Sequence, residues 1–160
     1  MEFELGCDNL HNIKAITKEL FNQLLEYKEF PKGIFKQQLT KLFSIGHNDL
    51  NDLNGQYLRI LVVNWQTVLT PCFIQFNNEE KNKWKEIFII WEQLQFLLYT
   101  DARAFHWKGI QLRIFILCEM FLINLSQMNN RIKNNIMKLY LHELIFHIPE
   151  FCLKYDFMSS

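Results

Sequence analysis

The helical character of this chain is clearest in residues 77–99, which read NNEEKNKWKEIFIIWEQLQFLLY. Large apolar residues recur here every three or four positions, as one face of an α-helix requires. They are Trp84, Ile87, Phe88, Trp91, Leu94 and Leu98. Asn77 suits a helix N-cap, and Glu79 and Glu80 would lie where the helix dipole favours carboxylates. This stretch therefore predicts a helix with one buried face.

Two segments before this stretch also have apolar residues every three or four positions. A first helix is predicted over residues 13–27, with Asp8 or Asn12 as its N-cap and its end at residues 31–33, which contain Pro31 and Gly33. A second, shorter helix is predicted over residues 35–43, and Gly46 would cap it.

Residues 57–76 are compatible with two structures. The spacing of Leu58, Leu61, Val62, Trp65 and Leu69 predicts a helix that Pro71 ends. β-Branched residues are frequent in the same segment, however, and such runs also suit strands. Residues 72–76 could form a short strand, so the choice between helix and strand stays open at this stage.

Two further helices are predicted towards the end of the chain. The helix over residues 106–127 is apolar on almost every side, which is typical of a central buried element. The other covers residues 132–147, before Pro149. We therefore expect an all-α protein, an irregular bundle of about six helices around a central apolar helix, with residues 1–160 forming a single domain.

The composition narrows the classes of function. The 17 basic and 17 acidic residues balance, so no overall positive field favours binding to nucleic acid or anionic lipid. The four cysteines lie far apart and the first residues lack the pattern of a signal peptide, so we expect reduced thiols and an intracellular protein, cytoplasmic or nuclear. The apolar run Ile110–Leu125 contains Arg113 and Glu119 and is shorter than a membrane span, so no membrane partner is expected.

The motifs of common catalytic and metal sites are not matched. His142 and His147 are five residues apart, which turns their rings roughly 140° from one another on an ideal helix and does not suit one metal ion. Asp49 and Asp52, with His47 nearby, could hold a hard cation, but a turn is favoured. Neither a nucleophile elbow nor a glycine-rich phosphate loop is found. We therefore expect no enzyme activity and no metal or cofactor.

Two surfaces could bind a partner. Trp84 and Trp91 lie two turns apart on one helix face and are either core residues or a face for a partner helix. Arg131, Lys133 and Lys138 could contact phosphates, although they also suit a solvated face. A protein partner is favoured over direct contact with nucleic acid.

The C-terminal segment carries a more specific pattern. Residues 139–151 read LYLHELIFHIPEF, with Lys154 and Tyr155 behind them. The pattern Tyr-x-His, four residues, His-x-Pro-Glu-Phe resembles a helical stretch of transposon-encoded proteins of the DDE class, namely CACTA-like and Kyakuja/Dileera-like transposases and their derivatives. The residues that match are Tyr140, His142, His147, Pro149, Phe151 and Tyr155. Upstream, residues 91–99 are similar to the helix that precedes this stretch in the same family.

The resemblance implies a helical insertion in a ribonuclease-H-like core, located before the last catalytic carboxylate. In the family that carboxylate belongs to a Gly-x-Glu segment, which this sequence does not contain. The proline that commonly precedes the tyrosine is also replaced, by Leu139 after Lys138. The resemblance therefore implies a non-catalytic helical fragment or derivative, with protein–protein contacts in a nucleoprotein assembly as its expected role. The alternative is a stand-alone helical interaction adaptor without a transposon link.

Overall fold

The computed structural model describes residues 2–44, 49–98 and 107–128. These residues form six α-helices, two short 3-10 helices and no strand. The α-helices are α1 (Glu2–Leu25), α2 (Lys32–Phe43), α3 (Gly55–Val63), α4 (Trp65–Leu69), α5 (Asn78–Leu98) and α6 (Trp107–Ser126), and the 3-10 helices are η1 (Leu50–Asp52) and η2 (Thr70–Phe73). The prediction of an all-α helical bundle is confirmed.

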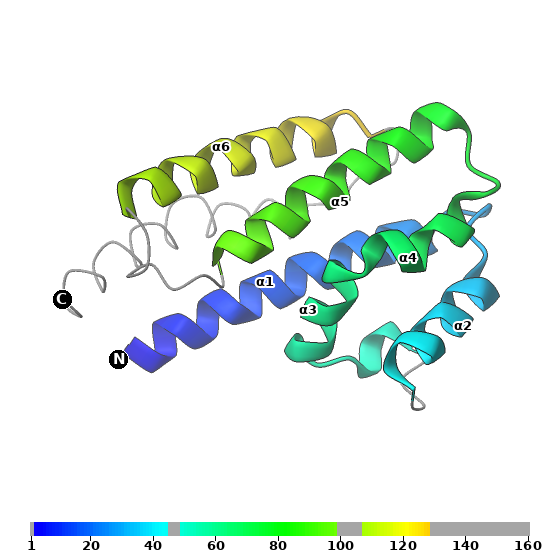
Figure 1. Ribbon diagram of the computed structural model, residues 1–160, viewed down its shortest axis with the longest axis horizontal. Helices are drawn as coiled ribbons and strands as arrows, with labels where there is room; N and C mark the ends of the chain where they lie inside the picture. Colours follow the sequence, from blue (N-terminus) through cyan, green and yellow to red (C-terminus); the bar gives the residue numbers. More distant parts are fainter. Residues whose placement is uncertain (1, 45–48, 99–106, 129–160) are drawn as a thin grey trace.

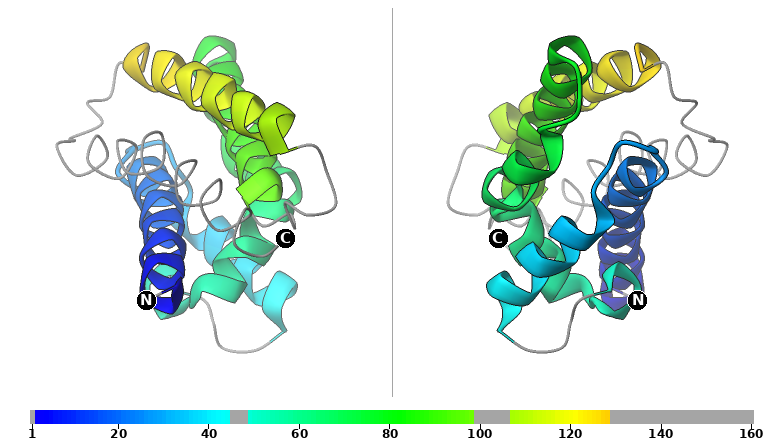
Figure 2. Two further views of the ribbon diagram at one scale, coloured as in Figure 1. Left: turned by 90° about the vertical axis from the view of Figure 1, so that its left-hand side faces the viewer. Right: turned by 90° about the vertical axis from the view of Figure 1, so that its right-hand side faces the viewer.

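The bundle consists of three long helices and a group of short ones. Helices α1, α5 and α6 run along the same diagonal in Figure 1, with α5 between the other two, while α2, α3 and α4 gather at one side of α1 and α5. The end-on views in Figure 2 show α6 against α5 and away from α1. Buried side chains from every described α-helix form one continuous core.

Helix α5 is the element around which the described part is organised. It begins where the sequence predicts, because the Asn77 side chain accepts a hydrogen bond from the Glu80 backbone N–H at 2.8 Å. Its apolar face is buried against several helices at once. Phe88 contacts Phe21 of α1, with ring centroids 5.1 Å apart, and Trp65 of α4 at 5.7 Å.

The position of α6 differs from the prediction of a central buried helix. One face of α6, which includes Ile114, Cys118 and Phe121, is buried, mainly against α5. The opposite face is exposed although it is apolar, so in the described structure α6 covers the bundle rather than forming its centre. The physical reason is that apolar side chains allow each face of a helix to be buried. A face is buried only where another element packs against it.

Residues 57–73 are helical except for Asn64, residues 74–76 form a turn, and the strand alternative is wrong. The predicted single helix is divided at Asn64 into α3 and α4, and η2 follows directly. The Asn64 side chain donates a hydrogen bond to the Ile60 carbonyl oxygen at 2.9 Å, a local bond that competes with the regular helical ladder. Pro71 lies in η2, so the segment 72–76 begins in a 3-10 helix and not in a strand.

Several predicted helix boundaries are also corrected. Helix α1 begins at Glu2, so Asp8 and Asn12 lie within it and are not caps. It ends at Leu25, before Pro31, which precedes the first turn of α2. Helix α2 ends at Phe43, and the left-handed conformation of its C-cap residue Ser44 (φ 59°) lets the Ser44 N–H donate to the Thr40 carbonyl oxygen. Gly46 and the predicted helix over residues 132–147 lie outside the described residues.

Candidate functional site

The two tryptophans proposed as a partner face belong to the core. Trp84 and Trp91 are 1% and 0% exposed. The Trp91 ring stacks on Phe121 of α6 at 5.3 Å, and its N–H donates to the Thr17 hydroxyl of α1 at 3.0 Å. The hypothesis that this face binds a partner is therefore wrong for the described fold, because α1 and α6 already cover it.

Trp84 takes part in a polar contact between α5 and the end of α1. Its indole N–H donates to the Tyr27 hydroxyl at 3.2 Å, and that hydroxyl donates to the Glu80 carboxylate at 3.2 Å. Burial of the phenol raises the pKa of Tyr27 to about 12, and the neighbouring Glu80 charge acts in the same direction. The hydroxyl thus stays neutral at physiological pH and acts as a structural link. The link is not visible in the sequence, because Tyr27 and Glu80 are 53 positions apart.

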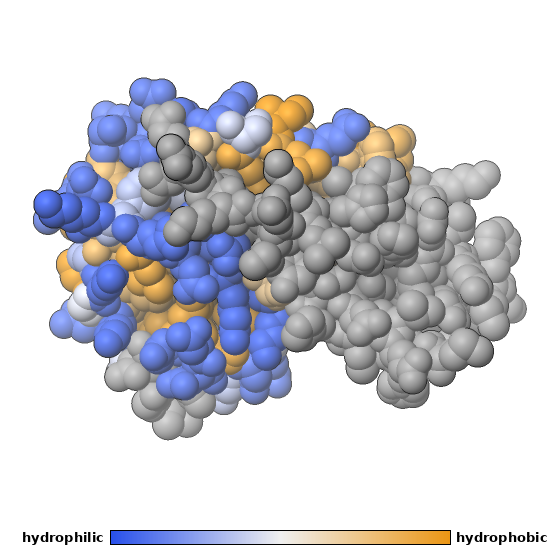
Figure 3. Space-filling view, turned by 180° about the vertical axis from the view of Figure 1, so that it is seen from behind, coloured by the Kyte–Doolittle hydropathy of each residue, from blue (hydrophilic) through white to orange (hydrophobic). Residues whose placement is uncertain are grey.

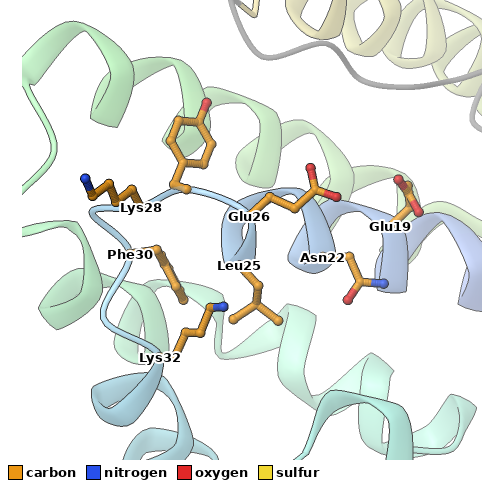
Figure 4. A pocket seen from close by; sticks show the side chains of 8 residues that line it. Glu19, Asn22, Leu25, Glu26, Lys28, Phe30 and Lys32 are labelled. Carbon is orange, nitrogen blue, oxygen red and sulfur yellow. The ribbon is translucent and has the colours of Figure 1, made fainter.

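An open depression of about 860 Å³ lies beside this link, at the C-terminal end of α1 and the turn that leads to α2 (Figure 4). Its apolar surface comes from Leu25, Tyr27 and Phe30. The remaining lining residues are polar or charged with both signs, namely Glu19, Asn22, Glu26, Lys28 and Lys32. Such a shallow, mixed lining differs from the enclosed and mostly apolar pockets that bind small molecules.

One buried polar atom near this region lacks a partner. Gln23 is 2% exposed, and its side-chain amide donates to the Glu19 carboxylate at 2.8 Å. Its side-chain oxygen Oε1 has no hydrogen-bond partner. An unpaired buried oxygen costs stability, but Gln23 is not among the residues that line the depression.

Asp49 serves the turn that the sequence favours. Its carboxylate accepts a hydrogen bond from the Asn51 N–H at 3.1 Å and caps η1, which also contains Asp52. His47 lies outside the described residues. Over the ranges that the structure describes, no group of three His, Cys, Asp or Glu side chains is arranged to hold a metal ion.

Cys72 and Cys118 are buried free thiols. Burial raises the pKa of Cys72 to about 11 and that of Cys118 to about 12. Because the thiolate is the nucleophilic form, both are unreactive at neutral pH. Cys118 is thus a small core residue of α6.

The outward face of α6, defined here as Leu112, Phe115, Ile116, Met120 and Ile123, holds five of the ten large apolar side chains that are exposed in the described residues. These side chains are between 40% and 60% exposed. They lie within about three helical turns, on the side opposite Ile114 and Phe121. In the part of the face that Figure 3 colours, hydrophilic residues lie next to apolar areas. The signal in the sequence was the apolar character of all sides of this helix, which we interpreted as central burial.

The remaining predicted site residues belong to the C-terminal segment after Met128. The family-like residues Tyr140, His142, His147, Pro149, Phe151 and Tyr155 lie outside the described residues, as do Arg131, Lys133 and Lys138. Their predicted roles stay predictions. Within the described ranges, no helix is both long and apolar enough to span a membrane.

No family model, no curated protein and no solved structure matches this chain.

Proposed function

We propose that this chain is a non-catalytic helical domain derived from a DDE-type transposase, and that it acts through protein–protein contacts in a nucleoprotein assembly. The derivation is supported by the pattern of residues 140–155 described above. The contact role is supported by one structural observation, the exposed apolar residues of the outward face of α6. An apolar face exposed on a helix that also packs on the core through its other side is typical of a docking surface.

The partner that suits this surface is a ribonuclease-H-like core. The resemblance implies that such a helical segment is an insertion in that core. A helix face with apolar residues at i, i+4 and i+11 (Leu112, Ile116 and Ile123) offers anchors for an apolar groove. Its described charged neighbours, Arg113 and Glu119, cancel one another, so this face lacks the excess of positive charge that phosphate binding requires.

The test uses the purified catalytic core of a CACTA-like transposase without its own helical insertion, after circular dichroism has verified its folding. We expect the full chain to bind this core in isothermal titration calorimetry. Ile116→Asp places a charge at the centre of the outward face and should weaken binding at least tenfold. Val63→Asp, on α3, is the matched control because Val63 is also exposed, at 60%, and should bind like the unchanged chain.

Failure of the unchanged chain to bind the core would overturn the proposed partner, and equal losses for the two variants would overturn the proposed surface. A DNA duplex serves as the competing probe. Binding to duplex DNA that weakens steeply with salt, without binding to the core, would mean direct contact with nucleic acid instead.

The transposon origin has an independent test. Reading the transcript beyond codon 160 should reveal an in-frame Gly-x-Glu segment or its decayed remnant. An unrelated continuation there, together with this helical domain recurring in other protein contexts, would favour the alternative of a stand-alone interaction adaptor.

A further inference from the structure

We draw no further inference here: the strongest candidate, the outward apolar face of α6, already belongs to the proposed function, and nothing in the structure shows which molecule covers it.

Discussion

The buried contact between Thr17 and Trp91 offers the sharpest test of how α1 and α5 pack. The Thr17 hydroxyl accepts the indole N–H of Trp91 at 3.0 Å and itself donates to the Ile13 carbonyl oxygen at 2.9 Å. Both side chains are at most 1% exposed. In Thr17→Val the shape is nearly kept, but the indole N–H loses its acceptor in a place that water does not reach.

An unsatisfied buried donor costs about 1–3 kcal/mol of unfolding free energy. With an m-value of about 2 kcal/mol per M urea, the midpoint of unfolding should fall by roughly 0.5–1.5 M. In a Trp91→Phe background no indole N–H is left unpaired, so the same Thr17→Val change should cost less than about 0.5 kcal/mol. The difference between the two costs measures the coupling between these side chains.

The assay is urea unfolding followed by tryptophan fluorescence and far-UV circular dichroism together, since coincident transitions justify a two-state treatment. Three tryptophans remain as probes in the Trp91→Phe background. Thr40→Val is the matched control, because the exposed Thr40 hydroxyl makes the same kind of bond, to the Lys36 carbonyl oxygen at 3.0 Å. It should change stability by less than about 0.5 kcal/mol. Equal costs of Thr17→Val in the two backgrounds would refute the proposed hydrogen bond.

Three further predictions concern the caps, the faces of α6 and pH. Asn77→Ala should lower the unfolding free energy by about 1 kcal/mol through loss of the α5 N-cap, and an unchanged urea midpoint would contradict the capping geometry. Ile114→Ala should cost about 2–5 kcal/mol because Ile114 is 1% exposed, whereas Ile116→Ala on the outward face should cost little, and similar thermal shifts for the pair would show that the faces of α6 are assigned wrongly. The folded pKa of Tyr27, about 12, exceeds the ordinary tyrosine pKa of 10.0, so its contribution to stability is complete below pH 10 and is lost as the pH rises towards 12. Titration of phenolate absorbance should show an ionisation step near pH 12, and this step should vanish in Tyr27→Phe.

The recurrence of apolar residues every three or four positions was sufficient to predict most of the helices. The start of α5 is a local matter, because the Asn77 cap and the carboxylates at Glu79 and Glu80 act within a single turn. The apolar face around Trp84 and Trp91 was likewise visible from spacing alone. Capping and the formation of an apolar helix face depend on residues only a few positions apart, so they can be recognised in the sequence.

Only the tertiary structure decided which apolar faces are covered. Trp91 is a core residue because it contacts Thr17 of α1 and Phe121 of α6. Its spacing in the sequence was equally compatible with a partner face. Ile116 remains exposed on α6 although Ile114, two positions earlier, is buried. Residues such as Ile60 and Val62 suited a strand by intrinsic preference, yet packing of α3 against α1 and α5 made them helical. Burial depends on contacts between residues far apart in the chain, and no local pattern specifies which helix will lie against which face.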